Sequence, residues 1–162
     1  MDPALEVHIR SLLALPNGII LVTGPTGCGK STTVGSCLEW LSSVRSGHYI
    51  TIEEPIEYIF KDRMGFFTQR EVGVDTPDYE TGLKNSLRQA PDVIFLGEIR
   101  QPETAMTCLQ AAETGHLVIS TMHTASVTEV FDRIVNLIPG VERDAMLSLL
   151  SDRKSTRLNS SH

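Results

Sequence analysis

Residues 24–32 place the strongest constraint on how this chain can fold. They read GPTGCGKST, which fits the pattern G-x-x-x-x-G-K-S, and they follow an apolar run at 18–23 and precede a helix-like segment at 32–44. Glycines at these positions let backbone N–H groups turn inward around an anion, because no Cβ stands in the way. A strand, a glycine-rich loop and a helix in this order are typical of a phosphate-binding loop, whose helix N-terminus also favours negative charge.

The loop residues predict a site for a nucleoside triphosphate. Lys30 can reach the β- and γ-phosphates, and Ser31 can ligate Mg²⁺. We expect nine residues to bind the nucleotide: Gly24, Pro25, Thr26, Gly27, Cys28, Gly29, Lys30, Ser31 and Thr32. A chance match to the pattern is the alternative, which the flanking strand-like and helix-like segments weaken.

Strand-like and helix-like segments alternate along the chain. Strands are expected at 18–23, 48–53, 92–97 and 117–121, and helices from residue 3, over 32–44, from 78 to before 91, from 102 to 115, over 126–138 and over 141–150. The stretch 54–74 is the least regular part and predicts a hairpin or an irregular excursion. This alternation favours an α/β fold, in which a parallel sheet is covered by helices on both faces.

Two groups of acidic residues follow predicted strands at the edge where such sheets bind ligands. Glu98 comes directly after the apolar run VIFLG, where a carboxylate can polarise an attacking water or hold Mg²⁺ through water. The segment TIEEPIEY places Glu53, Glu54 and Glu57 after an earlier strand. Acids near a phosphate site repel a triphosphate unless a metal ion or a water molecule requires them. Solvated surface glutamates are the alternative for both groups.

His116 and His123 bracket the last of these strands. Their spacing of seven residues means that no single helical turn pairs them. His123 follows the strand at the ligand edge, where it can sense the γ-phosphate, whereas His116 lies at the opposite end, where a structural role is expected. A histidine that only satisfies hydrogen bonds is the alternative for both.

Composition sets further limits. A length of 162 residues is enough for one domain, and the formal net charge of −6 argues against a broad nucleic-acid-binding surface. No apolar run approaches the length of a membrane span, and Asp2 and Glu6 stand where a signal peptide would carry basic residues. Three scattered cysteines fit a reducing cytoplasm. We therefore expect a cytoplasmic protein that binds no nucleic acid.

The last eleven residues, 152–162, differ from the rest. They read DRKSTRLNSSH, have no apolar periodicity and resemble the translation of a sequencing-adapter oligonucleotide. A natural polar tail is the alternative. We expect the folded domain to comprise residues 1–151, residues 152–162 to be a disordered adapter-derived tail, and the natural C-terminus to lie beyond this sequence.

Six segments together resemble the secretion-superfamily ATPases, the hexameric motors of type II secretion and type IV pili. These segments are GPTGCGKSTT, ITIEEPIEY, QREVGVDT, LRQAPDVIFLGEIR, AAETGHLVISTMHT and DRIVNLIP, and the resemblance runs over residues 15–150. It is greatest to the pilus-retraction motors of the PilT/PilU type. It implies a P-loop NTPase core with a RecA-like sheet, and ATP and Mg²⁺ as cofactors.

The resemblance also implies a role for each candidate residue. Glu98 becomes the Walker B glutamate and general base, and Glu57 becomes the closing glutamate of an acidic Asp box that starts at Glu53. His116 and His123 become the two His-box histidines. The implied catalytic residues are thus Glu98, Glu57, His123 and His116, and the implied Mg²⁺ ligands are Ser31 and, through water, Glu53.

The function implied is an ATP-hydrolysing motor domain that powers type IV pilus retraction and twitching motility. Its partners would be copies of itself in a homohexamer, the inner-membrane platform of the pilus and partner pilus ATPases, at the cytoplasmic face of the inner membrane. Two alternatives stay open: a type II secretion or pilus-extension ATPase, and a non-hydrolysing accessory subunit of a pilus motor.

The chain departs from the family pattern at three positions. Cys28 stands where serine is usual, and Glu54 and Gln101 each stand where aspartate is usual. We also expect the family's N-terminal PAS-like domain and C-terminal helices to be absent from this sequence, and the arginines that complete the site to come from elsewhere in the hexamer. The isolated fragment is therefore expected to be a weak or inactive ATPase.

Overall fold

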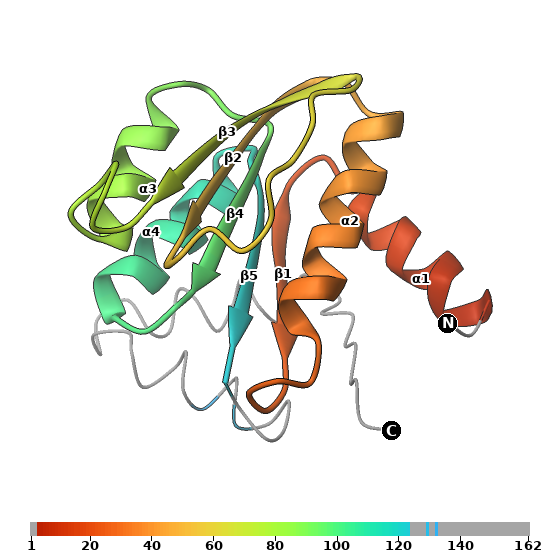
Figure 1. Ribbon diagram of the computed structural model, residues 1–162, viewed down its shortest axis with the longest axis horizontal. Helices are drawn as coiled ribbons and strands as arrows, with labels where there is room; N and C mark the ends of the chain where they lie inside the picture. Colours follow the sequence, from red (N-terminus) through yellow and green to blue (C-terminus); the bar gives the residue numbers. More distant parts are fainter. Residues whose placement is uncertain (1–2, 124–128, 130–131, 133–162) are drawn as a thin grey trace.

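A computed structural model describes residues 3–123, 129 and 132 of the chain (Figure 1). Its strands form one sheet in the order β1-β5-β4-β2-β3, and every neighbouring pair is parallel. The strands are β1 (Gly18–Thr23), β2 (Gly47–Glu53), β3 (Gly65–Glu71), β4 (Val93–Glu98) and β5 (Leu117–Met122). The helices are α1 (Pro3–Leu13), α2 (Lys30–Val44), α3 (Tyr79–Leu87) and α4 (Pro102–Glu113). The predicted α/β fold with a parallel sheet is confirmed.

Helices cover both faces of the sheet (Figure 1). Alternate residues of the central strands enter two separate cores, because successive side chains of a strand point to opposite faces. Ile94 and Leu96 of β4 belong to the core beneath α3 and α4, whereas Val93 and Phe95 belong to the core beneath α1 and α2. This double burial explains why β4 reads as a continuous apolar run.

The hairpin considered for residues 54–74 is wrong. Residues 65–71 form β3, which pairs in parallel with β2 from Gly47↔Gly65 to Glu53↔Glu71 at the edge of the main sheet. The pattern for this strand is weak in the sequence because an edge strand needs few apolar residues. Side chains cap its outer edge: the Phe67 N–H donates to Asp62 Oδ1 at 2.8 Å, and the Glu71 N–H donates to Asp75 Oδ2 at 2.8 Å.

Several boundaries shift by one to three residues from those predicted. The helix after the loop begins at Lys30 rather than at 32, and Glu98 is the last residue of β4 rather than the residue after it. The helices predicted at 126–138 and 141–150 and the tail predicted at 152–162 lie outside the described residues, apart from Glu129 and Asp132. No helix in the described part of the chain is long and apolar enough to span a membrane.

Candidate nucleotide-binding site

The loop between β1 and α2 turns through glycines. Gly27 has a φ of 77° and Gly29 a φ of 90°, both in the left-handed region, and a Cβ at either position would meet no atom within 4 Å. Glycine is therefore required here for its backbone conformation and not for space. The turn leads directly into α2, whose N-terminus points at the loop. The helix dipole therefore favours an anion bound within the loop.

Lys30 is held within the loop. Its side chain is buried, with the residue 8% exposed, and its ammonium donates to Gly24 O at 2.9 Å and to Pro25 O at 2.8 Å. A buried charge is tolerated only where hydrogen bonds replace its lost water. The loop thus fixes one positive charge at the N-terminus of α2.

His123 lies between this loop and Glu98. Its Nδ1 is 3.3 Å from Lys30 Nζ and 3.4 Å from Thr26 Oγ1, and its Nε2 is 3.8 Å from Glu98 Oε2. The histidine follows β5, which is hydrogen-bonded to both β1 and β4. This topology brings three candidate residues from distant segments to one point, as the sequence predicts for the carboxyl ends of parallel strands.

Glu98 is paired with a residue that sequence reasoning did not assign to the site. Its side chain is 15% exposed, and its Oε1 forms an ion pair with Arg100 Nη2. Arg100 Nη1 also lies 3.9 Å from Glu54 Oε2. The hydrogen bond to Glu98 raises the pKa of the Arg100 guanidinium above its ordinary value. Glu98 and Arg100 are two residues apart in the sequence, but this separation at the end of a strand does not predict that their side chains form an ion pair.

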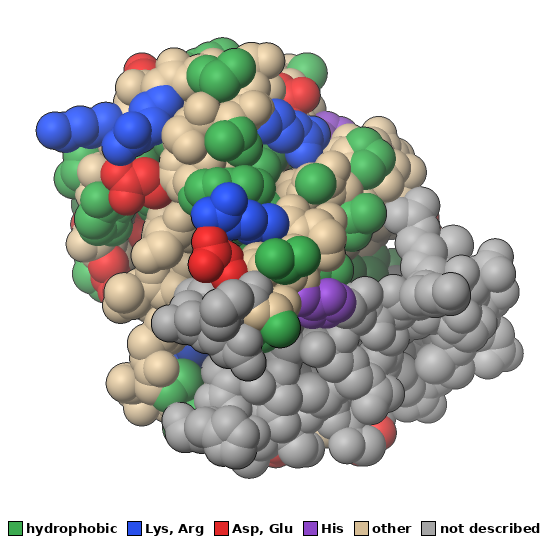
Figure 2. Space-filling view, turned by 90° about the vertical axis from the view of Figure 1, so that its right-hand side faces the viewer, with side chains coloured by type: hydrophobic (Ala, Val, Ile, Leu, Met, Phe, Trp, Pro, Cys, Tyr) green, Lys and Arg blue, Asp and Glu red, His purple; other side chains and the backbone are tan. Residues whose placement is uncertain are grey.

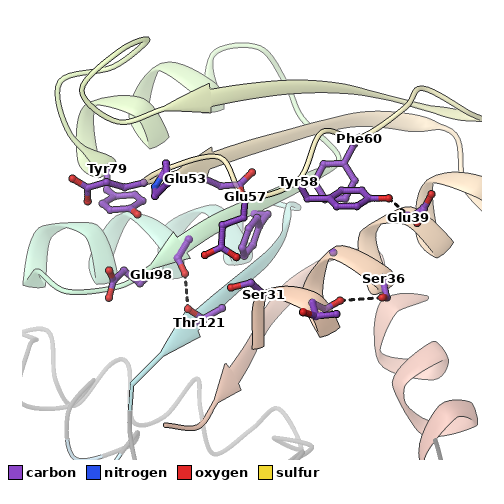
Figure 3. A pocket seen from close by; sticks show the side chains of 16 residues that line it. Ser31, Ser36, Glu39, Glu53, Glu57, Tyr58, Phe60, Tyr79, Glu98 and Thr121 are labelled. Atoms are coloured by element: carbon purple, nitrogen blue, oxygen red, sulfur yellow. Dashed lines mark hydrogen bonds between the residues drawn. The ribbon is translucent and has the colours of Figure 1, made fainter. Parts of the chain in front are cut away.

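A cavity of about 290 Å³ opens beside the loop (Figure 3). One side is formed by α2, including Ser31, Thr32 and Glu39, and the other by the remaining carboxylates and Tyr79. The glutamates that line it are Glu39, Glu53, Glu54, Glu57 and Glu98. We call these carboxylates the acidic wall and residues 24–32, of which Ser31 and Thr32 line the cavity, the loop wall. The arrangement can hold phosphates on one side and water or a cation on the other.

Glu53 is the most enclosed member of the acidic wall. It is 7% exposed, and its Oε1 has no hydrogen-bond partner among the described residues. Burial raises the pKa of its carboxyl above the ordinary value, and the neighbouring polar groups of Thr51, Glu57 and Gln69 oppose this shift in part. An orphaned carboxylate oxygen at a cavity is a group that a hydrated cation would satisfy.

The donors present fit Mg²⁺ better than a softer metal. Ser31 and the acidic wall offer hydroxyl and carboxylate oxygens, which are the ligands that Mg²⁺ prefers. Within the described residues, no group of three or more His, Cys, Asp or Glu side chains is arranged to hold a metal. A site of one or two protein oxygens suits an ion that keeps several waters and binds substrate phosphates.

The structure does not bring His116 to this site. The residue lies before β5, whereas His123 follows it, and a six-residue strand separates them by about 20 Å. His116 Nδ1 is 3.0 Å from Ala111 O and 3.4 Å from Thr114 Oγ1, at the end of α4. This placement agrees with the structural role expected from its position, and among the described residues it shows no contact that would serve the catalytic role implied by the resemblance.

Cys28 lies on the other side of the loop from the acidic wall. It is exposed and borders an apolar groove between α1 and α2, together with Leu5, Ile9 and Cys37. On this side of the molecule, hydrophobic side chains are interspersed with charged ones (Figure 2). Burial raises the pKa of the Cys37 thiol, and that of Cys108 to about 12. Cys28 is thus the most accessible thiol among the three cysteines.

Comparison with known proteins identifies the family. The family model described as Type II/IV secretion system protein matches residues 1–158. The type IV pilus retraction ATPase PilT of Pseudomonas aeruginosa is 44% identical over 138 residues, which are 85% of this chain and 40% of that protein. The type II secretion system protein E of Klebsiella pneumoniae is 44% identical over an alignment of 162 residues, covering 98% of this chain and 31% of that protein.

Solved structures give the same result. A crystal structure of the pilus retraction motor PilT with bound ADP matches with a TM-score of 0.85 and 46% identity, over 94% of this chain and 43% of that one. The Legionella pneumophila ATPase DotB matches with a TM-score of 0.81 and 35% identity, over 86% of this chain and 39% of that one. The chain spans about two fifths of the length of PilT. It belongs to the type II/IV secretion system protein family.

Proposed function

We propose that this chain is the ATP-hydrolysing core of a motor that powers type IV pilus retraction. One observation carries the proposal: His123 lies 3.3 Å from the ammonium of Lys30 and 3.8 Å from the carboxylate of Glu98. A phosphate-binding cation and a carboxylate able to accept a proton therefore face one small volume. That is the arrangement that phosphoryl transfer from a nucleotide to water requires.

The proposed mechanism assigns one task to each wall. The loop wall binds the phosphates through its backbone N–H groups, the ammonium of Lys30 and the N-terminus of α2. Ser31 and, through water, Glu53 would hold Mg²⁺, which supplies positive charge for the β- and γ-phosphates when bound. Glu98 accepts a proton from the attacking water, and Glu57 stands on the same wall as an alternative base. His123 senses the terminal phosphate from its position beside Lys30.

The motor role, the partners and the location are part of the proposal. The match to the pilus retraction motor PilT supports retraction. We further propose a homohexamer that acts on the inner-membrane platform of the pilus beside partner pilus ATPases, at the cytoplasmic face of the membrane. The second candidate is a type II secretion ATPase, which is supported by the equal identity to protein E of Klebsiella pneumoniae over a larger share of this chain.

Phosphate release from Mg-ATP by the protein in its whole natural length tests hydrolysis, with chelation of Mg²⁺ by EDTA as the comparison. We expect Mg²⁺-dependent turnover, and nucleotide binding without turnover would favour the accessory-subunit alternative. The isolated chain of 162 residues is expected to hydrolyse ATP weakly or not at all. A second experiment distinguishes pilus retraction from type II secretion. The gene for the protein in its whole natural length would be introduced into one strain that lacks pilus retraction and another that lacks the type II secretion ATPase. Restored twitching supports retraction, whereas restored secretion alone contradicts it.

A further inference from the structure

The end of β4 is irregular where it reaches the cavity. Leu96 pairs with Ser120 of β5, and Glu98 pairs with the next residue, Thr121, so Gly97 is an extra residue in the ladder. A bulge of this kind bends a strand and changes the direction of the next side chain. Two hydroxyls fix it from β5: Ser120 Oγ donates to Leu96 O at 2.8 Å, and Thr121 Oγ1 donates to Gly97 O at 2.6 Å.

Tyr79 lies against the bulge from the side of α3. A Cβ built on Gly97 would stand 3.0 Å from Tyr79 Oη and 3.4 Å from Ile52 O. The phenol oxygen therefore fills the space that the missing side chain leaves, which gives a reason for glycine at this position apart from backbone freedom. The hydroxyl and the bulge meet one residue before Glu98.

The position of the Tyr79 ring is set by the fold. Tyr79 is the first residue of α3, and the Asp78 side chain caps this helix by accepting from the Thr81 N–H at 2.7 Å. The ring packs against the core beneath α3 and α4. Figure 3 shows Tyr79 and Glu98 on the same side of the cavity. A helix start and a core contact thus hold the hydroxyl at the end of β4.

Charges around the hydroxyl keep it protonated. Burial is the main cause that raises the pKa of Tyr79 to about 12, and the negative charges of Glu98, Glu54 and Glu53 add to it, while Arg100 opposes it. At neutral pH the phenol therefore keeps its proton in the field of these carboxylates.

We propose that Tyr79 is a positioning residue for Glu98: its hydroxyl sits on the Gly97 bulge and holds the carboxylate in the direction that faces the loop. The inference rests on the proposed function, because it takes Glu98 as the general base. Packing of the core needs only the ring of Tyr79, so an effect of the hydroxyl alone distinguishes positioning from a structural role.

Three variants of the full protein test the proposal. Tyr79→Phe removes only the hydroxyl, and we expect kcat to fall about 3- to 10-fold with KM for ATP unchanged. Gly97→Ala adds a Cβ that would stand 3.0 Å from Tyr79 Oη, so the hydroxyl must shift by a few tenths of an ångström. We expect kcat to fall by less than the roughly 100-fold that a displacement of about 1 Å causes. The double variant Gly97→Ala/Tyr79→Phe should recover part of this loss, because phenylalanine lacks the oxygen.

Tyr49→Phe is the matched control. The Tyr49 hydroxyl donates to Arg45 O at 2.9 Å from the buried side chain of β2, away from the cavity. We expect Tyr49→Phe to lower Tm and leave kcat unchanged. Tyr79→Phe is expected to lower kcat and leave Tm unchanged. Unchanged kcat in Tyr79→Phe, or no recovery in the double variant, overturns the positioning role while hydrolysis by the unsubstituted protein stands. Absence of hydrolysis by the unsubstituted protein overturns the proposed function and the inference with it, so the two failures are distinguishable.

Discussion

The loop wall and the acidic wall of the site are built in different ways. The loop wall comes from one continuous segment, and Lys30 bonds to carbonyls only five and six residues before it. The acidic wall is assembled from α2, the ends of β2 and β4 and the segment between β2 and β3, and Arg100 ties part of it together between Glu98 and Glu54. The geometry of the loop wall is set by contacts within residues 24–32. The geometry of the acidic wall depends on the sheet that brings its separate segments together.

This difference predicts a separation of functions. Substitutions in the loop wall should change nucleotide affinity, because that wall supplies the attractive charge. Substitutions in the acidic wall should change turnover or stability with little loss of affinity, because its carboxylates repel phosphates. Each prediction below tests one side of that separation.

The largest effect is expected at Glu98. Glu98→Gln keeps the shape of the side chain but loses the base, so turnover should fall about 10²- to 10⁴-fold while ATP still binds. The measurements are phosphate release and titration with a fluorescent ATP analogue on the same preparation. Glu113→Gln, an exposed residue at the end of α4, is the matched control. Full turnover in Glu98→Gln would move the role of base to Glu57.

Lys30→Ala tests the loop wall. Charged hydrogen bonds contribute about 1.5–3 kcal/mol each, so the loss of this ammonium should weaken binding of the fluorescent ATP analogue by at least about 100-fold. Lys84→Ala is the control, because Lys84 lies on α3 in an exposed pair with Glu80. Affinity equal to that of the unsubstituted protein would contradict the assignment of residues 24–32 as the phosphate-binding loop.

Glu53→Gln should affect stability with a defined pH dependence. The pKa of Glu53 is raised in the folded protein, so folding is favoured below the ordinary glutamate pKa and loses that contribution as pH rises through the raised value. The substituted amide carries no charge, and the variant should therefore have a Tm roughly 2–4 °C higher than the unsubstituted protein at pH 7. The difference should vanish below about pH 4. Thermal unfolding monitored by circular dichroism at both pH values checks this, and a lower Tm at pH 7 would count against it.

The smallest effect is expected at Cys28. Its exposed thiol should react with a maleimide, and Mg-ATP should slow the reaction several-fold if the nucleotide covers the loop. Cys28→Ser identifies the label, because Cys108 is buried and Cys37 is partly buried. Equal labelling rates with and without nucleotide would show that Cys28 does not contact the bound nucleotide.

The difference between the loop wall and the acidic wall also explains which parts of the site could be predicted from the sequence. The loop, its strand and its helix were predictable because their signals are local: glycine spacing, an apolar run and a helical segment. His123 could be placed because a parallel sheet gathers the ends of its strands at one edge. The contacts of Arg100 and Tyr79 could not be predicted, since they depend on the bulge at Gly97 and on where α3 begins.

Two other outcomes have physical reasons. The strand at 65–71 has a weak pattern because it lies at an edge and carries polar residues in its second half. For the histidines, reasoning from strand direction separated His116 from His123, and the structure agrees with that separation. The family resemblance placed both histidines in one motif, because they are close in sequence. A motif does not show that a whole strand separates its two members in space.

The capped edge of β3 has a consequence for aggregation. An open edge strand normally offers a row of free donors to any extended chain that it meets. Here the Phe67 and Glu71 N–H groups are already bonded to the carboxylates of Asp62 and Asp75. An incoming strand would have to displace two charge-assisted hydrogen bonds, each of about 1.5–3 kcal/mol, and would meet two negative charges. This side of the sheet is therefore protected against edge-to-edge polymerisation by its own turns.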